Sequence, residues 1–293
     1  MRPSSPHVMK VGLVGLGVMG WPIAANLASA GKLSYVANRT QSKAREFATT
    51  FKVEALEMRE LAAESDVVIT MLSDDSAVRD FVRSVLAYLK GKILVDMSTI
   101  SPSLSIQLAE EVRGAGGVMY DAPVVGTSIF AQQRKLVVLL GGPEEKRELV
   151  EDLLKHTASA VVYFGGNGSG LYSKLVNNLM VGTYVAALAE AFNLGVKAGL
   201  SKEQVERILT QLSSVRSPTS ELKAPKLRTE DYSTQFATKH MRKDLEIVQG
   251  EAQRLGLFVP MSSLALQLYR LAEASGMAER DFSSIYEIYK KSK

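Results

Sequence analysis

The first half of the chain alternates short apolar runs with longer stretches of helical periodicity. The runs are expected strands, at residues 11–16, 34–38, 66–72, 93–97, 118–122, 136–140 and 161–164. The third run, DVVITML, is apolar almost throughout, which is typical of a strand covered by helices on both faces. Because strands that alternate with helices build βαβ units, we predict an α/β fold with a doubly wound, mostly parallel sheet.

The pattern changes at a glycine-rich stretch, GGNGSG, at residues 165–170. Beyond it no strand is expected, and helical periodicity covers residues 171–198, 201–212, 239–255, 260–274 and 283–290. The length of 293 residues is ordinary for two domains. We therefore predict an α/β domain over residues 1–167 and an all-α C-terminal domain over residues 168–293, which would serve the substrate and subunit contacts.

Composition excludes several classes of site. The chain has no cysteine, which excludes disulfides, thiolate metal sites and a cysteine nucleophile. Its three histidines are far apart in the sequence, so no metal is expected. The net charge of +4 includes no long basic run, so no nucleic-acid partner is expected.

Two observations on apolar residues bear on where the protein is located in the cell. The most apolar stretch, residues 175–196, contains three asparagines and a glutamate, so we expect a buried helix and no membrane partner. The first ten residues lack an apolar core, so we expect no secretory signal and a cytoplasmic location.

The first strand ends in a glycine-rich turn, Gly15-Leu16-Gly17-Val18-Met19-Gly20, and a helix is expected to follow. In this context the first glycine permits the tight turn and the second lets the backbone approach a pyrophosphate. The third lets the helix pack closely on the strand. The free N–H groups of the helix N-terminus then face the phosphates. The turn therefore predicts a Rossmann-type, dinucleotide-binding domain.

The end of the second strand, Asn38-Arg39-Thr40, indicates which dinucleotide binds. Enzymes that prefer NAD usually carry an acidic residue here, which accepts hydrogen bonds from the ribose hydroxyls. This chain has none, and Arg39 offers a guanidinium to a 2′-phosphate. We expect NADP as the cofactor, with NAD as the less favoured alternative. A solvated surface charge is the alternative explanation for Arg39.

Two further strand ends are expected to line the same crevice, because ligands bind beyond the carboxyl ends of parallel strands. One provides Met71, Leu72 and Ser73 for the ribose and nicotinamide, and the other places the hydroxyls of Ser98 and Thr99 near the reacting ring. Turn and cap chemistry is the alternative explanation for Ser73 and Ser98.

Five motifs, in this order and spacing, resemble the β-hydroxyacid dehydrogenases. They are GLGVMG at 15–20, DMST at 96–99, DAPV at 121–124, GxxxKLxNN at 170–178 and KD at 243–244, and they span nearly the whole chain. The resemblance implies hydride transfer between NADP(H) and the carbonyl or hydroxyl carbon of a small carboxylic acid, without a metal. Substrates of that class include 3-hydroxyisobutyrate, L-serine, semialdehydes and glyoxylate.

The resemblance also implies roles for individual residues. Lys243 matches a lysine that contacts the cofactor near its nicotinamide end, and Asp244 follows it in the substrate site. Thr99 matches a cofactor-contacting threonine, and Ser98 matches a substrate-contacting serine.

By the same resemblance, Lys174 matches the catalytic lysine and Asn178 the amide beside it. Residues four apart on a helix project from one face, and this face is otherwise apolar. Apolar surroundings disfavour an ammonium ion, so we expect the pKa of Lys174 to fall toward the range useful for proton transfer. Lys174 would exchange a proton with the substrate oxygen while Asn178 holds that oxygen. A lysine extended along the surface is the alternative.

The substrate loop departs from the family pattern DAPVSGG. Val125 replaces the serine and Thr127 the second glycine, so the side chain at 125 cannot donate a hydrogen bond to a substrate carboxylate. The hydroxyl of Thr127 and the backbone amides of Gly126 and Thr127 remain as donors. Arg134 and Lys135 also stand where the family often has a glycine and a small or polar residue.

Other proteins of the same architecture remain as alternatives. An imine-reducing relative lacks the lysine, and a non-catalytic relative usually loses it and carries appended modules. A 6-phosphogluconate dehydrogenase is longer and has basic residues for its phosphosugar. Separately, the helix expected near residues 171–198 is apolar around most of its circumference, so we expect a second copy to cover part of it, in a homodimer or homotetramer.

Overall fold

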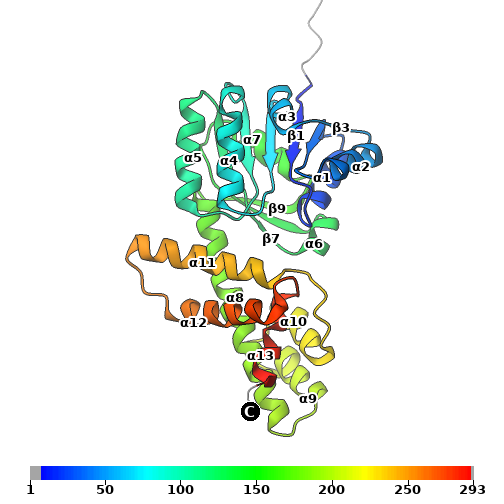
Figure 1. The fold of residues 1–293 in the computed structure, drawn as a ribbon, viewed down its shortest axis with the longest axis vertical. Helices are drawn as coiled ribbons and strands as arrows, with labels where there is room; N and C mark the ends of the chain where they lie inside the picture. Colours follow the sequence, from blue (N-terminus) through cyan, green and yellow to red (C-terminus); the bar gives the residue numbers. More distant parts are fainter. Residues whose placement is uncertain (1–7, 292–293) are drawn as a thin grey trace, which may run out of the picture. The chain divides into compact units, whose positions relative to one another are not determined.

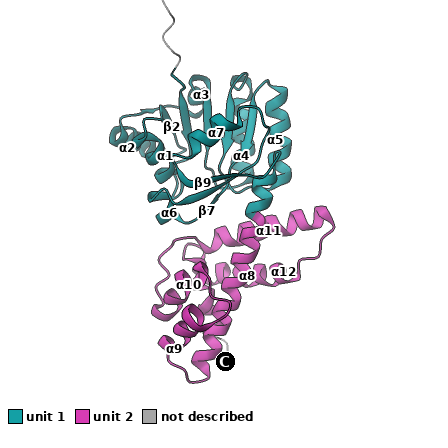
Figure 2. Cartoon of the chain, turned by 180° about the vertical axis from the view of Figure 1, so that it is seen from behind, with its two compact units in different colours: residues 1–174 teal, residues 175–293 magenta. Residues whose placement is uncertain are grey.

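The structure is a computed structural model that describes residues 8–291 (Figure 1). Residues 1–7, on which the expectation about a secretory signal partly depends, lie outside the described part. The chain divides into two compact units, residues 1–174 and residues 175–293 (Figure 2). This division falls inside a long helix, whereas the boundary suggested by the sequence precedes that helix.

The first unit is built on a six-stranded parallel sheet in the order β3-β2-β1-β4-β5-β6. Its strands are β1 Val11–Val14, β2 Tyr35–Ala37, β3 Glu54–Ala55, β4 Val67–Thr70, β5 Ile93–Asp96 and β6 Val118–Asp121. The chain runs outward from β1 to β3 and then resumes on the other side of β1 at β4. This arrangement confirms the doubly wound α/β fold, and the switch between β1 and β4 is where such sheets bind ligands.

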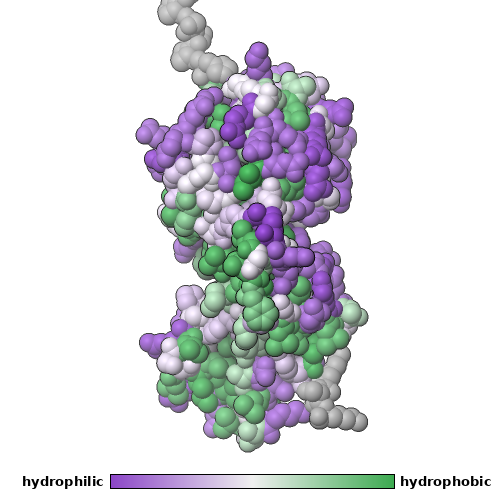
Figure 3. All heavy atoms as spheres, turned by 90° about the vertical axis from the view of Figure 1, so that its left-hand side faces the viewer, coloured by the Kyte–Doolittle hydropathy of each residue, from purple (hydrophilic) through white to green (hydrophobic). Residues whose placement is uncertain are grey.

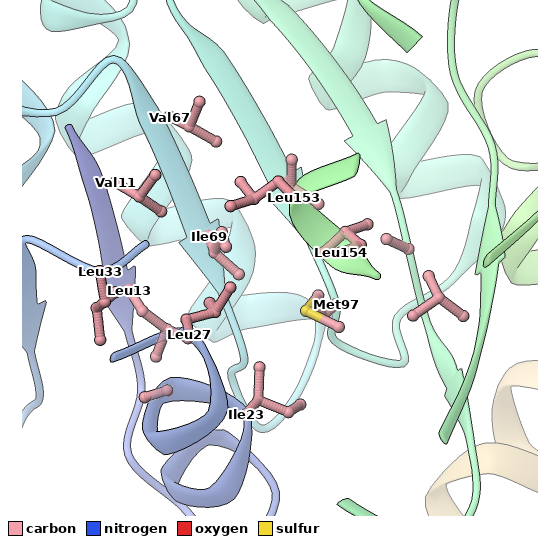
Figure 4. Close-up of a cluster of buried hydrophobic side chains, with 14 of the residues drawn as sticks. Val11, Leu13, Ile23, Leu27, Leu33, Val67, Ile69, Met97, Leu153 and Leu154 are labelled. Atoms are coloured by element: carbon pink, nitrogen blue, oxygen red, sulfur yellow. The ribbon is translucent and has the colours of Figure 1, made fainter. Parts of the chain in front are cut away.

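Helices cover both faces of this sheet: α1 Gly20–Ser29, α2 Gln41–Phe51, α3 Met58–Glu64, α4 Asp75–Val85, η1 Leu86–Tyr88, α5 Pro102–Gly114 and α7 Arg147–Leu154. Alternate residues of a strand enter two separate cores. Ile69 packs in the core that includes residues of α1, α2 and α7, whereas Val68 packs with α3, α4 and α5. Figure 4 shows Ile23 and Leu27 of α1 beside Leu13 and Ile69 in the first core. Burial on both faces explains why the strand sequences are continuously apolar.

A second, three-stranded sheet follows, in the order β7-β8-β9. Its strands are β7 Val124–Val125, β8 Leu136–Leu140 and β9 Ala158–Tyr163, and α6 Ser128–Gln132 lies between the first two. Strand β7 runs antiparallel to β8, while β8 and β9 are parallel. A backbone bridge between Asp121 and Gly141 joins the two sheets. The last two strands expected from the sequence are therefore present, in a sheet of their own.

The described residues of the second unit form helices joined by loops, with an isolated backbone bridge between Ala237 and Asp281. Its elements are α8 Ser169–Lys197, which begins in the first unit, α9 Lys202–Arg207, η2 Ile208–Leu212, α10 Pro218–Thr229, α11 Thr238–Leu255, α12 Pro260–Ala272, η3 Glu273–Met277, η4 Phe282–Ile285 and α13 Tyr286–Lys291. The all-α character expected of this part is confirmed. Helix α10 was not expected from the sequence.

Helix α8 is, within residues 8–291, the one helix long and apolar enough to cross a membrane by length and composition. One third (33%) of its most apolar window is buried. The core helix of a soluble protein passes the same test, so this property alone does not indicate a membrane span.

Candidate active site

The glycine turn after β1 has the shape that a dinucleotide requires. Gly15 has a φ of 103°, and a Cβ there would lie 2.3 Å from the carbonyl oxygen of Met71. A Cβ at Gly20 would lie 1.9 Å from the carbonyl oxygen of Gly15, whereas Gly17 has no atom within 4 Å of its Cβ position. The first and third glycines are therefore needed for packing, and the second faces open space. Helix α1 starts with no side-chain cap and no acidic residue in its first turn, which suits a pyrophosphate.

Asn38, at the end of β2, ties the glycine turn to the next loop. Its side-chain oxygen accepts a hydrogen bond from the backbone N–H of Leu16 at 2.9 Å, and its amide group donates to the carbonyl oxygen of Thr40 at 3.2 Å. The neighbouring Arg39 and Thr40 are exposed. Helix α2, which follows, has no acidic residue in its first turn. The loop thus presents an exposed cation and carries no acidic residue of its own. The carboxylate of Glu57 lies nearby and accepts a hydrogen bond from the Gln41 side chain at 2.7 Å.

A buried carboxylate joins the loops that follow β4 and β5. Asp96 Oδ1 accepts hydrogen bonds from the hydroxyl of Thr70 at 2.7 Å and from the hydroxyl of Ser98 at 2.6 Å. The Ser98 hydroxyl in turn accepts the backbone N–H of Leu72 at 2.8 Å. Ser98 is 1% exposed. The hydroxyl that the sequence assigned to the substrate is therefore occupied within the fold, where it fixes the two loops.

Burial raises the pKa of Asp96 to about 6, against the opposing effect of the hydrogen bonds from Ser98 and Thr70. A carboxyl group whose pKa is higher in the folded than in the unfolded protein stabilises the fold below its unfolded pKa, here 3.8. That contribution is lost as the pH rises through about 6. Acidification from about pH 8 to about pH 5 should therefore increase this group's contribution to the free energy of unfolding by about 1.4 kcal/mol.

Asp96→Asn removes this titration and keeps an acceptor oxygen for Thr70 and Ser98. The free energy of unfolding, measured in urea at both pH values, is expected to favour the variant more at pH 8 than at pH 5, by about 1.4 kcal/mol. An identical pH dependence in the two proteins would show that Asp96 does not titrate in this range.

The other residues expected in the crevice take ordinary positions in the loops. Met71, Leu72 and Thr99 are half-buried. Ser73 is exposed, and its hydroxyl donates to Asp74 at 2.7 Å, while Asp74 caps α4. The Ser73 hydroxyl thus takes part in cap chemistry, which was the alternative explanation for it.

Lys174 lies on α8, in the part that belongs to the first unit, and is 7% exposed. Its ammonium donates a hydrogen bond to the carbonyl oxygen of Val124 at 2.8 Å. A lysine extended along the surface would not be buried in this way, so the structure does not support that alternative.

Asn178 lies one helical turn after Lys174, in the part of α8 that belongs to the second unit, and is 3% exposed. Its amide group donates to Asp244 Oδ2 at 2.5 Å. The other carboxylate oxygen of Asp244 lies 3.3 Å from the ammonium of Lys243. The second unit therefore gathers three of the predicted site residues, and the helix places Asn178 on the same face as Lys174.

The loop with the altered family motif surrounds β7. Val125 is half-buried and pairs with β8. Gly126 has a φ of 127°, and a Cβ there would lie 2.7 Å from the side chain of Leu136, so this glycine is structurally required. Thr127 precedes α6 without capping it through its side chain. Arg134 has a φ of 57°, a conformation that glycine adopts at less cost, which fits the glycine common at this position in the family.

Two buried aspartates, Asp96 and Asp121, were not identified as functional from the sequence. Each ends an otherwise apolar strand and lies in a motif that carries the family resemblance. Their position at the carboxyl ends of strands was the sequence feature that could have identified them as functional. Among the described residues, no group of three or more His, Cys, Asp or Glu side chains could hold a metal ion.

Comparison with known proteins decides the family. Residues 10–165 match the family described as the NAD binding domain of 6-phosphogluconate dehydrogenase. Residues 168–289 match the family described as NAD-binding of NADP-dependent 3-hydroxyisobutyrate dehydrogenase. The chain belongs to the β-hydroxyacid dehydrogenase family. As a β-hydroxyacid dehydrogenase it is an oxidoreductase with a nicotinamide cofactor, and the resemblance drawn from the five motifs is confirmed.

Individual β-hydroxyacid dehydrogenases match over most of their length. Mitochondrial 3-hydroxyisobutyrate dehydrogenase of Mus musculus is 34% identical over 288 residues, which are 94% of this chain and 86% of the mouse protein. Chloroplastic glyoxylate/succinic semialdehyde reductase 2 of Arabidopsis thaliana is 29% identical over 289 residues, 97% of this chain and 80% of that protein. The solved structure of Mycobacterium tuberculosis 3-hydroxyisobutyrate dehydrogenase with L-serine has a TM-score of 0.88 at 28% identity, covering 96% of this chain and 99% of that one.

Proposed function

We propose that this protein is an NADP-dependent dehydrogenase of a small 3-hydroxy acid, or in reverse a reductase of a small aldehyde acid, with Lys174 as proton donor and acceptor. The observation that carries the proposal is the buried ammonium of Lys174, held 2.8 Å from the Val124 carbonyl on the same helix face as the amide of Asn178. The named relatives act on 3-hydroxyisobutyrate, glyoxylate or succinic semialdehyde, which supports the substrate class.

The roles of these residues follow from their hydrogen-bonding capacity. The nicotinamide cofactor, when bound, supplies or accepts the hydride. The Val124 carbonyl accepts a hydrogen bond from the Lys174 ammonium and so fixes the position of this charged group. We assign to the same ammonium the hydrogen bond to the substrate oxygen. Lys174 gives that oxygen a proton in reduction and removes it in oxidation.

Asn178 has two amide hydrogens, of which Asp244 accepts one. The second is left to hold the same substrate oxygen, and Asp244 sets the orientation of the amide. Lys243 lies beside Asp244. The family resemblance implies that its positive charge contacts the cofactor near the nicotinamide.

The preference for NADP rests on the loop after β2. An exposed Arg39 follows Asn38, whose side chain is already engaged with Leu16 and Thr40. Residues 38–40 include no carboxylate to accept the ribose hydroxyls, and one would repel a 2′-phosphate. The guanidinium of Arg39 can form a charged, bidentate hydrogen-bonded contact with such a phosphate.

A spectrophotometric screen tests the proposal. Oxidation of NADPH and of NADH is followed with glyoxylate and with succinic, malonic and methylmalonic semialdehydes, and the reverse reaction with 3-hydroxyisobutyrate and L-serine. We expect turnover with at least one of these acids and a higher kcat/KM with NADPH than with NADH. Turnover of cyclic imines alone, or cofactor binding without turnover of any acid, would contradict the proposal.

Val125→Ser restores the serine of the family motif and tests whether the altered loop sets substrate choice. A new hydrogen bond to the carboxylate contributes about 1 kcal/mol, so KM for glyoxylate is expected to fall about fivefold. Val125→Ala is the matched control, because it removes the bulk without adding a hydroxyl. An equal gain in both variants would indicate a steric effect, and no change in either would mean that other donors already hold the carboxylate.

We also propose that a second copy covers the apolar surface of the helical unit. Val176, Met180 and Leu194 of α8 are each at least 60% exposed, and Figure 3 shows hydrophobic residues spread over one face of this unit. Such surface is unusual for a monomer, which supports a homodimer or homotetramer.

A further inference from the structure

Asp121, the last residue of β6, is completely buried and is bonded to the start of α8. Its Oδ1 accepts the backbone N–H of Gly168 at 2.7 Å, and its Oδ2 accepts the backbone N–H of Leu171 at 2.9 Å. The first N–H groups of a helix have no partner within the helix, so this carboxylate satisfies donors that would otherwise be buried without one. The two contacts bridge about fifty residues of sequence.

The surroundings of this carboxylate are shaped by two glycines. A Cβ at Gly141 would lie 2.7 Å from each carboxylate oxygen of Asp121. A Cβ at Gly170 would lie 2.9 Å from Oδ2 and 2.3 Å from the carbonyl oxygen of Leu139. Neither glycine has a φ in the left-handed region, so what these positions require is space rather than backbone freedom. The chain leaves room for one acceptor group to reach the helix start.

The segment of residues 121–124 is linked to Lys174 in two ways, one through the helix backbone and one through the ammonium. Asp121 holds the turn of α8 that ends at Leu171, three residues before Lys174. Val124, three residues after Asp121, accepts the hydrogen bond from the Lys174 ammonium. Thus one end of residues 121–124 fixes the backbone that carries the lysine, and the other fixes its charged group.

We propose that Asp121 is a positioning residue for Lys174. Asp121 fixes the position of the first turn of α8 along the helix axis and its rotation about that axis, so that the ammonium meets the substrate oxygen. This inference rests on the proposed function, because it needs Lys174 to transfer the proton. A displacement of about 1 Å can cost a reaction about a hundredfold.

Asp121→Asn is the first test. An amide of the same shape offers one acceptor oxygen, so one of the two helix N–H groups would face an NH₂ group instead. We expect kcat to fall at least tenfold while KM for NADPH stays within about twofold of wild type, because Asp121 is not among the residues proposed to bind the cofactor. Circular dichroism checks that the variant is folded.

The same substitution in a Lys174→Met background shows whether Asp121 acts through the lysine. If it does, Asp121→Asn produces little further loss of the residual turnover of Lys174→Met. An equal fold-loss in both backgrounds would overturn the inference, as would an Asp121→Asn variant with kcat within twofold of wild type. Failure of the proposed function is seen separately, as near-normal turnover of Lys174→Met alone.

Gly141→Ala is a second variant in case Asp121→Asn does not fold. It retains the carboxylate and its charge. The added methyl group would displace them, because its Cβ would lie 2.7 Å from both carboxylate oxygens and from the backbone nitrogen of Gly170. We expect the same pattern, a fall in kcat with little change in KM for NADPH, and no further loss in the Lys174→Met background. Turnover equal to wild type would count against the inference.

Ser217→Ala provides the matched control. Ser217 caps α10 in the second unit, so this variant also loses a helix cap. We expect it to lower thermal stability without changing kcat or the pH profile. A loss of kcat in Ser217→Ala as large as that in Asp121→Asn would show that any lost cap impairs turnover, and would overturn the specific role of Asp121.

Discussion

Lys174→Met is expected to leave a folded protein that binds its cofactor and turns over a hundred to ten thousand times more slowly. Methionine fills a similar volume and needs no hydrogen-bond partner at this buried position. The loss follows from the usual value of general acid–base catalysis, about 10²–10⁴-fold. Measured kcat with saturating NADPH, together with cofactor binding by fluorescence, tests this result.

Two related variants and the pH profile separate proton transfer from simple positioning by charge. Lys174→Arg keeps the charge but does not release a proton in the working pH range, so its turnover is expected to be nearly as low. Asn178→Ala is expected to cost less, because the amide orients the oxygen without transferring a proton. The limb of the oxidation profile that rises with pH should disappear in Lys174→Met. Near-normal turnover of that variant would remove Lys174 from the mechanism.

Arg39→Ala is expected to raise the dissociation constant for NADPH ten- to a hundredfold and to leave that for NADH almost unchanged. The loss of a charged contact to a phosphate costs about 1.5–3 kcal/mol, and NADH lacks the phosphate. Arg45→Ala is a suitable control, since it removes one exposed positive charge from the same region of α2. Isothermal titration with both cofactors gives the four constants needed for each variant.

An equal loss with NADPH and NADH would mean that Arg39 contacts a part that the cofactors share. A loss in Arg45→Ala as large as that in Arg39→Ala would point to general electrostatic attraction. Either result would leave the cofactor preference without its structural basis.

The sequence predicts the parallel sheet well, because strands buried on both faces must be apolar throughout. It does not predict α10, which contains Pro225 in its interior and begins with Pro218. That helix is maintained by contacts distant in sequence. The ammonium of Lys223 lies 2.9 Å from both carboxylate oxygens of Asp281, and no local periodicity reveals such a pairing.

In the candidate site, too, the sequence predicts the local relations between residues but not the contacts between distant segments. Motif spacing places Lys174 and Asn178 on one helix, since that relation is local. It places Ser98 at the correct edge of the sheet and close to Asp96 in the sequence. It does not reveal the hydrogen bonds from Thr70 to Asp96 and from Leu72 to Ser98, which join segments 26 residues apart. The contact from Asp121 to Leu171 likewise depends on how two distant segments meet.

Helix α8 assigns Lys174 to one compact unit and Asn178 to the other without an intervening loop. Each residue inserted between them would turn the later side chain by about 100° and shift it by about 1.5 Å along the helix axis. Chimaeric enzymes that exchange the helical unit between relatives must therefore join their parts outside residues 174–178, or match that interval residue for residue.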